Sequence, residues 1–208
     1  MKTNSRLGLA LIITAPSGTG KSTLIKRLLA EFPDAGFSIS CTTRSPRPGE
    51  TDGKDYHFLT VERFLARIEA GDFAEWAKVH DNYYGTPKQG VLEMLAAGRD
   101  VVFDIDVQGA KALRGNLDLG RTVFILPPSR QDLEKRLAGR GSDSPESIAK
   151  RISNAKAEIE QADWFDHIVV NDMLEKAYDE LRAVYLAERA RPCHHPGLLE
   201  SVLDSWKL

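Results

Sequence analysis

The sequence has little cysteine and no apolar run long enough to cross a membrane. Its 208 residues include only two cysteines, Cys41 and Cys193. These are too few for a disulfide framework, so both thiols are expected to be reduced. The longest apolar run, residues 7–15, is far shorter than the roughly 20 residues that a bilayer-spanning helix needs. A secretory signal is disfavoured too, because the run leads into a glycine-rich loop instead of a cleavage site. These absences predict a cytoplasmic protein with no membrane partner.

Neither sign of charge dominates the sequence. The 28 Lys and Arg residues nearly balance the 30 Asp and Glu residues, which gives a formal net charge of -2. No global positive field would recruit nucleic acid, so any anion site must be built locally. Aromatic residues make up only 8% of the chain, but 42% of it is hydrophobic. The composition is that of an ordinary globular protein with a sizeable core.

Short apolar runs alternate with helical patterns along the chain. Strands are expected at residues 9–14, 37–40, 101–103, 123–126 and 168–170, with one more through Trp76 and Val79. Helices are expected at residues 24–32, 60–71, 87–98 and 129–139, from 144 onward, and at 174–185. This alternation predicts an α/β fold whose mainly parallel sheet is covered by helices on both faces. Ligands bind at the carboxyl ends of the strands in such folds.

A glycine-rich segment between the first strand and the first helix carries the strongest functional signal. The string APSGTGKST matches the P-loop pattern GxxxxGK(S/T), except that Ala15 stands in place of the first glycine. Gly18 and Gly20 let the backbone turn its N–H groups around a phosphate. Lys21 would neutralise phosphate oxygens, and the Ser22 hydroxyl would ligate magnesium. A ligand-free turn is the alternative, but a loop between strand and helix is the context that supports binding. The expected ATP-binding set is Ala15, Pro16, Ser17, Gly18, Thr19, Gly20, Lys21, Ser22 and Thr23.

Two carboxylates follow the apolar strand at residues 101–103. Asp104 and Asp106 fit the acidic group that holds magnesium beside a P-loop, often through water. Simple capping at the strand end is the alternative, and the P-loop elsewhere in the chain favours the metal. We take Ser22 and Asp104 as the expected magnesium ligands, although the pattern alone does not decide between the two carboxylates.

A loop rich in arginine and proline, residues 42–59, suggests a second anion site. Arg44 and Arg47 lie three residues apart, and Tyr56 stands at the following strand. Two fork-shaped guanidinium groups and a phenol can hold one phosphate. Taken alone, the loop is more typical of a solvated basic segment.

The same loop resembles the signature of guanylate kinases, T(S/T)Rxx(K/R)xx(D/E)xxGxxYx(F/Y). Every specified position is matched, by Thr42, Thr43, Arg44, Arg47, Glu50, Gly53, Tyr56 and Phe58. The resemblance covers about residues 8–190 and includes GDFAEWAKVHDNYYGT, DIDVQGAK, FILPPS and RLAGRG. It implies a P-loop NTPase fold with an inserted monophosphate-binding lobe and a lid. It also implies the family's reaction in purine nucleotide metabolism, in which ATP and magnesium convert GMP, and also dGMP, to the diphosphate.

The resemblance also implies which residues bind GMP. The expected set is Ser40, Arg44, Arg47, Glu50, Tyr56, Glu75, Tyr84, Gly85, Thr86 and Asp106. Among them, Arg44, Arg47, Tyr56 and Tyr84 would hold the phosphate. An ionised Glu75 would accept hydrogen bonds from N1–H and the 2-amino group of guanine, where adenine offers a bare N1. The hydroxyls of Ser40 and Thr86 could donate to O6. In the alternative, Glu75 faces solvent beside a buried Trp76.

Three further arginines flank a stretch that resembles the lid of this family. Arg136, Arg140 and Arg151 would close over ATP, neutralise charge on the transferred group and exclude water. In the alternative, they are solvated helix charges. Together with Lys21 and Arg44 they are the expected catalytic residues. No general base is needed, because a phosphate acceptor with a second pKa of about 6 is already ionised at pH 7.

The expected organisation is one guanylate-kinase-like domain with a short extension. The domain is expected at residues 7–190, with the core at 7–40, 98–135 and 156–190, the GMP lobe at 41–97, the lid at 136–155, and the extension at 191–208. Within the extension, Cys193, His194 and His195 are adjacent and cannot easily aim three side chains at one ion, so a solvated tail is expected.

Two other functions compete with a GMP kinase. One is a non-catalytic guanylate-kinase-like module that binds phosphorylated partners, which the intact Gly18, Gly20, Lys21 and Ser22 disfavour. The other is a kinase for another monophosphate, which Glu75 together with Thr86 disfavours. The sequence leaves the oligomeric state open, a homo-oligomer included.

Overall fold

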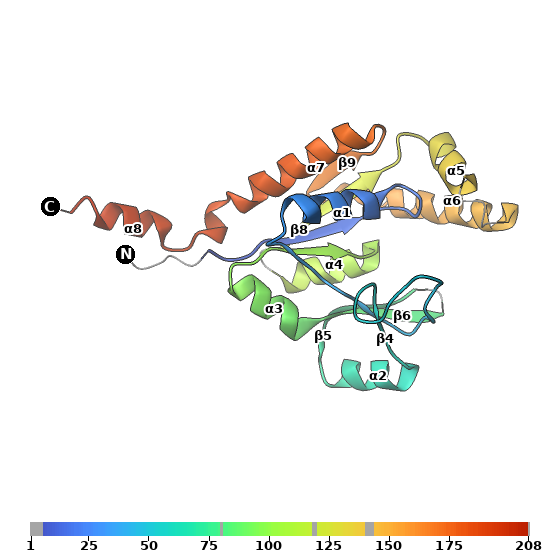
Figure 1. Cartoon of the computed structure of the whole chain (residues 1–208), viewed down its shortest axis with the longest axis horizontal. Helices are drawn as coiled ribbons and strands as arrows, with labels where there is room; N and C mark the ends of the chain where they lie inside the picture. Colours follow the sequence, from blue (N-terminus) through green and yellow to red (C-terminus); the bar gives the residue numbers. More distant parts are fainter. Residues whose placement is uncertain (1–5, 80, 118–119, 140–143, 208) are drawn as a thin grey trace.

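A five-stranded parallel sheet forms the core of the protein (Figure 1). A computed structural model describes residues 6–79, 81–117, 120–139 and 144–207. All neighbouring strands of the sheet are parallel. In spatial order they are β2 (Gly36–Phe37), β7 (Val101–Asp104), β1 (Ala10–Thr14), β8 (Gly120–Leu126) and β9 (His167–Val170). The central strand β1 is buried along its whole length, as its apolar run predicts.

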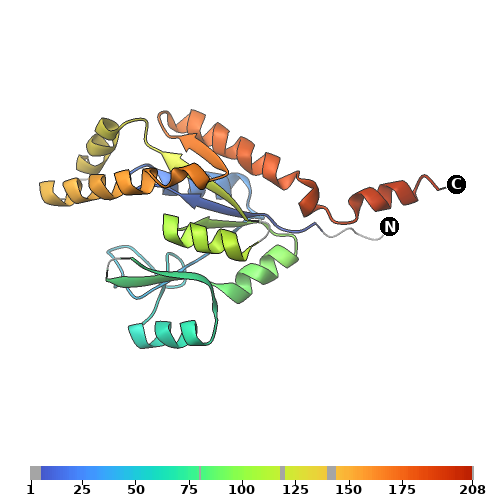
Figure 2. The ribbon, with the colours of Figure 1, turned by 180° about the vertical axis from the view of Figure 1, so that it is seen from behind.

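Helices cover both faces of this sheet, because alternate residues of β1 pack in opposite directions. Leu11 and Ile13 pack in one cluster with α1 (Lys21–Glu31) and α7 (Leu174–Arg189). Ala10 and Ile12 pack in a second cluster with α3 (Lys88–Ala96) and α4 (Val107–Asn116). Figures 1 and 2 show the two layers from opposite sides. The mainly parallel α/β architecture that the sequence predicts is therefore confirmed.

A smaller four-stranded sheet stands beside the core. Its order is β4-β3-β6-β5, and the pairs β3·β6 and β5·β6 are antiparallel. The bounds are β3 (Cys41–Thr42), β4 (His57–Phe58), β5 (Phe73–Val79) and β6 (Asn82–Pro87), with α2 (Val61–Glu69) packed on the sheet. Phe64 of α2 stacks on Phe73 at 4.5 Å between ring centroids. A small apolar core of its own thus holds this sheet together.

The remaining helices follow β8 in the sequence. Leu133 and Leu137 of α5 (Arg130–Ala138) pack against Ala155 of α6 (Pro145–Ile159). Two short 3₁₀ helices follow, at Ala162–Trp164 and Pro192–His194, and the last helix is α8 (Leu198–Asp204). Within the described ranges, no helix combines the length and apolar character that a membrane crossing requires.

Three helices begin where the sequence predicts, with the N-cap at residues 60, 129 and 144, and each start is capped by a side chain. The side chains of Thr60, Ser129 and Ser144 accept hydrogen bonds from backbone N–H groups at the starts of α2, α5 and α6. The strand expected at residues 37–40 is wrong in its extent. Only Gly36–Phe37 pairs with β7, and the chain then crosses to the smaller sheet, where Cys41–Thr42 forms β3.

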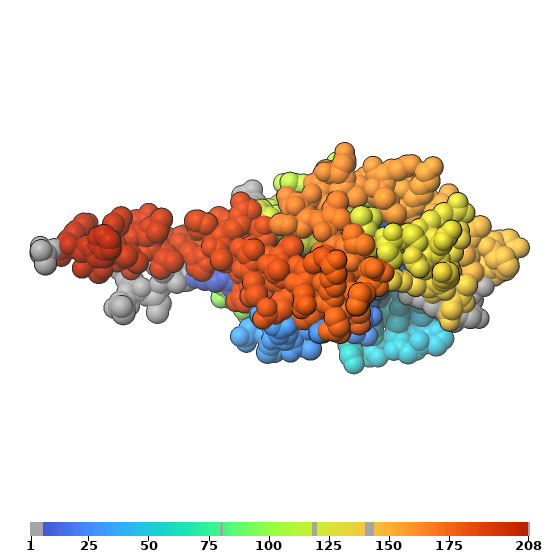
Figure 3. Space-filling view, turned by 90° about the horizontal axis from the view of Figure 1, so that it is seen from above, coloured from blue at the N-terminus to red at the C-terminus, as the bar shows by residue number. Residues whose placement is uncertain are grey.

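The expected solvated tail is also partly wrong. His194 is fully buried, and its Nδ1 lies 3.2 Å from the carbonyl oxygen of Leu7. The backbone N–H of Leu7 in turn donates to the carbonyl oxygen of His194 at 2.9 Å. Cys193 is exposed as expected. Beyond this contact, α8 projects away from the body of the molecule (Figure 3).

Candidate active site

The glycine-rich loop links β1 to α1 and has the backbone that a phosphate cradle requires. Gly18 and Gly20 have φ values of 93° and 98°, in the left-handed region that side chains other than glycine rarely adopt. Space excludes a side chain as well, because a Cβ would lie 2.7 Å from Leu137 Cδ2 at Gly18 and 2.5 Å from Asn171 Nδ2 at Gly20. No side chain caps α1, and its first turn holds no acidic residue. The Thr23 N–H donates to the carbonyl oxygen of Gly20 at 3.1 Å, whereas no backbone hydrogen bond within the described residues engages the N–H groups of Lys21 and Ser22, which remain available to an anion.

The two carboxylates near β7 have different roles in this structure. Asp104, the last residue of β7, forms an ion pair with Lys21 at the start of α1. Asp106 instead begins α4, where its Oδ1 accepts a hydrogen bond from the Gly109 N–H at 2.8 Å. The capping alternative therefore describes Asp106, and the magnesium role of Asp104 stays a prediction. Asp104 faces the P-loop lysine, whereas Asp106 caps a helix.

Asn171 and Arg136 hold the backbone of the glycine-rich loop. Asn171 Nδ2 donates to the carbonyl oxygen of Thr19 at 2.7 Å. Arg136 of α5 donates to the same carbonyl at 3.3 Å and to the carbonyl oxygen of Asn171 at 2.8 Å. Asn171 is not among the site residues predicted from the sequence. The one sequence feature that points to Asn171 is its position directly after β9, because ligand sites of α/β sheets lie at the carboxyl ends of parallel strands.

Arg44 is held in place by a carboxylate and two rings. Its Nη1 and Nη2 each donate to an oxygen of Glu50 at 2.9 Å. Its guanidinium lies 5.3 Å from the ring centroid of Tyr56 and 5.9 Å from that of Phe58. Hydrogen bonding with Arg44 keeps the pKa of Glu50 below its usual value. Glu50 also accepts from the backbone N–H of Arg47 at 2.7 Å, while the Arg47 side chain is exposed. The structure thus shows Glu50 orienting Arg44 and fixing the loop.

Glu75 is a buried carboxylate in β5. It is 7% exposed, whereas the neighbouring Trp76 is 46% exposed, so the alternative of a solvent-facing Glu75 beside a buried Trp76 is wrong. The cause is the strand alternation, which turns Glu75 toward Thr86, its partner in β6. Thr86 Oγ1 donates to Glu75 Oε1 at 2.6 Å, so its one O–H is already engaged. Burial raises the pKa of Glu75 to about 7, and the charge of Asp106 adds to the effect.

One cavity collects residues from the P-loop, β7 and the smaller sheet. It measures about 160 Å³, and its lining includes Lys21, Ser40, Tyr56, Glu75, Tyr84, Asp104 and Asp106. An adjoining cleft of about 650 Å³ shares Ser40, Tyr56 and Asp104 and adds Ser22, Arg47 and Glu50. Gly85 lies in β6 between Tyr84 and Thr86. The two spaces are therefore lined by Lys21 and Ser22 of the phosphate loop and by seven of the ten expected acceptor residues. The other three, Arg44, Gly85 and Thr86, line neither space.

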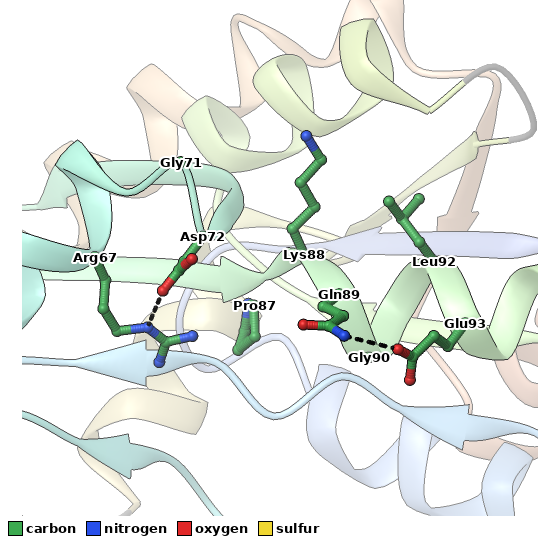
Figure 4. Close-up of a pocket in the computed structure, with 9 residues that line it drawn as sticks. All are labelled: Arg67, Gly71, Asp72, Pro87, Lys88, Gln89, Gly90, Leu92 and Glu93. Atoms are coloured by element: carbon green, nitrogen blue, oxygen red, sulfur yellow. Dashed lines mark hydrogen bonds and ion pairs between the residues drawn. The ribbon is translucent and has the colours of Figure 1, made fainter.

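The lid arginines are placed apart from this cavity. Arg151 lies on α6, and neither it nor Arg136 lines the two spaces described above. Arg140 lies outside the described residues. A further hollow of about 600 Å³ lies where β6 passes into α3 (Figure 4). Figure 4 shows Arg67 paired with Asp72 there, at 3.4 Å. None of the expected site residues lines that hollow.

Magnesium would need ligands from the substrate at this site. Within the described ranges, no group of three or more His, Cys, Asp and Glu side chains could hold a metal ion. Ser22 and Asp104 line the same cleft. Mg²⁺ is usually bound by one or two carboxylates together with substrate phosphates and water. One hydroxyl and one carboxylate beside a phosphate loop fit that donor set.

Comparisons with known proteins agree with one another. The family model described as guanylate kinase matches residues 8–188. The chain is 57% identical over 201 residues to the guanylate kinase of Nitratidesulfovibrio vulgaris, covering 97% of each chain. It is 54% identical over 202 residues to that of Oleidesulfovibrio alaskensis, covering 97% of this chain and 98% of the relative. The crystal structure of guanylate kinase from Anaplasma phagocytophilum has a TM-score of 0.80 at 28% identity, covering 98% of this chain and 97% of that one.

Proposed function

The chain belongs to the guanylate kinase family, and we propose that the cavity between its P-loop and its smaller sheet is where the family's reaction takes place. That reaction transfers the γ-phosphoryl group of ATP to GMP and gives ADP and GDP. The observation that carries the assignment of the site is the shared cavity, which is lined by Lys21 of the phosphate loop and by Glu75 and Tyr84 of the smaller sheet. Donor and acceptor phosphates would meet there.

The ATP phosphates would lie on residues 15–23, at the N-terminus of α1. The free N–H groups there and the positive end of the helix dipole attract an anion without a basic surface. Lys21 is paired with Asp104 in the described structure. Arriving phosphates would compete for the ammonium group of Lys21. Asp104 would then be released toward a cation.

Ser22 and Asp104 would hold magnesium together with the phosphate oxygens. When bound, the ion neutralises phosphate charge that would otherwise oppose the transfer. The pairing of Lys21 with Asp104 supports this assignment, because the carboxylate already lies next to the residue that contacts the phosphates. We assign the ion to Asp104 in preference to Asp106, because Oδ1 of Asp106 is already engaged by the Gly109 N–H at the start of α4.

The GMP phosphate would be held by Arg44, Arg47, Tyr56 and Tyr84. Arg44 is oriented before GMP binds, because Glu50 engages two of its nitrogens at 2.9 Å. This arrangement reduces the entropy that binding would otherwise lose. Arg47 is exposed in the described structure, so it would engage only when the lobe at residues 41–97 moves toward the core.

Glu75 would read the guanine base. Two N–H groups on one edge of guanine can each donate to the carboxylate, and these bonds favour its ionised form even though burial raises its pKa to about 7. Adenine presents an acceptor at N1, which leaves the buried carboxylate without that partner. The hydroxyl of Thr86 orients Oε1 of Glu75, at 2.6 Å. Ser40, which lines the same cavity, is then the hydroxyl that can donate to O6.

The chemical step would need alignment and charge neutralisation. The acceptor oxygen is ionised at pH 7, because a phosphate monoester has a second pKa of about 6. Lys21, Arg44 and the lid arginines Arg136 and Arg151 would supply positive charge around the transferred group. Closure of a lid at residues 136–155 would exclude the water that could otherwise hydrolyse ATP. The recognised groups of the acceptor are its base edge and its phosphate, so dGMP should also serve.

A panel of acceptors tests this function. ADP formation is measured with ATP, magnesium and GMP, dGMP, AMP, CMP or UMP in turn, together with a control that lacks an acceptor. Rapid turnover confined to GMP and dGMP is expected. Comparable turnover with AMP would contradict the role of Glu75. Absence of turnover with every acceptor, despite ATP binding, would favour a non-catalytic module instead.

A further inference from the structure

Gly109 lies in the first turn of α4, directly against the buried carboxylate of β5. Its backbone N–H donates to Asp106 Oδ1 at 2.8 Å, which closes the helix cap. A Cβ placed on Gly109 would lie 2.9 Å from Glu75 Oε2 and 3.3 Å from Asp106 Oδ1. The helix α4 is in contact with β5, and the ribbon shows the two elements near each other (Figure 1). The space that a side chain would fill at position 109 is therefore occupied by the end of Glu75.

The backbone does not explain the glycine. Gly109 is buried inside a helix, and its φ is not positive, unlike those of Gly18 and Gly20. Glycine is less favourable than alanine at an ordinary helical position, because it loses more conformational freedom on folding. What the position does require is the absence of a Cβ beside Glu75.

We propose that Gly109 is a positioning residue that determines specificity for the acceptor base. Because it has no side chain, it leaves room for the Glu75 carboxylate to lie where it can bind guanine. This inference rests on the proposed function, in which Glu75 reads guanine. In that position Oε1 accepts from Thr86 Oγ1 at 2.6 Å, and the side chain lines the acceptor cavity. Gly109 does not contact the substrate. It acts through Glu75.

A methyl group at position 109 would move the carboxylate without breaking the fold. Real Cβ atoms do not approach an oxygen to 2.9 Å, so Glu75 Oε2 must shift. The end of a glutamate side chain can shift at low cost to packing. The shift, however, either lengthens the bond from Thr86 or turns the oxygens away from the base edge. We therefore expect binding of GMP to be weakened while folding stability is kept.

The test compares Gly109→Ala with Gly115→Ala in the full chain. Gly115 lies in the same helix, is exposed, and has no atom within 4 Å of an added Cβ. Both variants gain the same helix-favouring methyl, so their melting temperatures should change alike. In Gly109→Ala alone, KM for GMP should rise roughly tenfold to hundredfold, the size expected for one hydrogen bond to a charged group. Its kcat at saturating GMP and its KM for ATP should stay within about twofold of the parent, because the lost contact is uniform binding energy.

A second comparison separates positioning from general damage to the cavity. Glu75→Asp shortens the side chain and withdraws the carboxylate from position 109. In the Glu75→Asp background, Gly109→Ala should therefore change KM for GMP by less than about twofold, because the collision is gone. IMP, which lacks the 2-amino group, gives a further readout. The preference for GMP over IMP should fall in Gly109→Ala and stay at the parent value in Gly115→Ala.

The outcomes distinguish the role of Gly109 from the proposed recognition of guanine by Glu75. An unchanged KM for GMP in Gly109→Ala, with Glu75→Gln losing its preference for GMP, would overturn the role of Gly109 alone. Retained preference for GMP in both variants would overturn the guanine assignment of Glu75 as well. Equal effects of Gly109→Ala in both backgrounds would also contradict the inference, because they would show that the methyl does not act through Glu75.

Discussion

Replacing Glu75 by Gln should weaken GMP binding and stabilise the unliganded protein. The Glu75→Gln variant keeps the shape of the side chain but removes its charge and one of its two acceptor oxygens. A hydrogen bond to a charged group contributes about 1.5–3 kcal/mol when its partner is lost. That loss corresponds to a fall of about 10- to 150-fold in kcat/KM for GMP. The KM for ATP should stay unchanged, since residues 15–23 are unaltered.

The same substitution should raise stability above neutral pH. Burial raises the pKa of Glu75 from 4.5 to about 7, so the folded protein holds this proton more tightly than the unfolded chain does. Stability contributed by this group is therefore present below about pH 4.5 and falls as the pH rises to about 7. At pH 8 the buried charge costs the unliganded fold about 3 kcal/mol, taken from 1.36 kcal/mol per pKa unit. Glu75→Gln lacks that cost, because its amide does not ionise.

Two measurements with one control decide this prediction. Urea unfolding without nucleotide, at pH 5 and pH 8, should show the variant gaining stability over the parent only at the higher pH. Steady-state kinetics with GMP and with AMP should show the selectivity falling. Glu69→Gln removes one exposed charge from the same lobe and should alter neither result. A variant that is less stable than the parent at pH 8 would refute the reasoning about burial. Retained selectivity for GMP would refute the guanine assignment.

Three further substitutions test the other parts of the site. Lys21→Ala should reduce transfer to GMP at least about a hundredfold, the size seen when one electrostatic contact to a transition state is removed, as measured by ADP formation. Glu50→Gln should raise KM for GMP about tenfold with little change in KM for ATP, because Arg44 loses a charged partner that holds it at 2.9 Å. Asn171→Ala should raise KM for ATP in initial-rate kinetics with little change in KM for GMP, because the hydrogen bond from Asn171 to the carbonyl oxygen of Thr19 fixes the phosphate loop. Unchanged constants in any of these variants would contradict the role of that residue.

Much of the fold could be predicted from the sequence because its signals are local. The apolar run of β1, the glycines of the phosphate loop and the caps Thr60, Ser129 and Ser144 each depend on residues within a few positions. Such local preferences agree with the final structure in a foldable sequence. The extent of the strand expected at residues 37–40 could not be predicted from such local signals. There the chain leaves one sheet and joins another, which only the pairing of distant strands decides.

The features that escaped prediction, in the site and outside it, depend on contacts between distant residues. The burial of His194 follows from its contact with Leu7 across the chain. The different roles of Asp104 and Asp106 appear only when α1 and α4 are placed beside β7. Gly109 looks like an ordinary small residue until the end of Glu75 is seen to lie where its Cβ would be. No pattern of residue spacing in the sequence indicates that these residues are in contact.

The most direct test of the account follows the transferred group itself. ATP labelled in its γ-phosphoryl group is mixed with GMP, magnesium and the full chain, and the products are separated. The account predicts that the label appears in GDP at the rate at which ADP forms, and that this transfer is lost in Lys21→Ala. Label released mainly as inorganic phosphate, or ADP formed at the same rate without GMP, would contradict the claim that the cavity joins the two nucleotides for direct transfer.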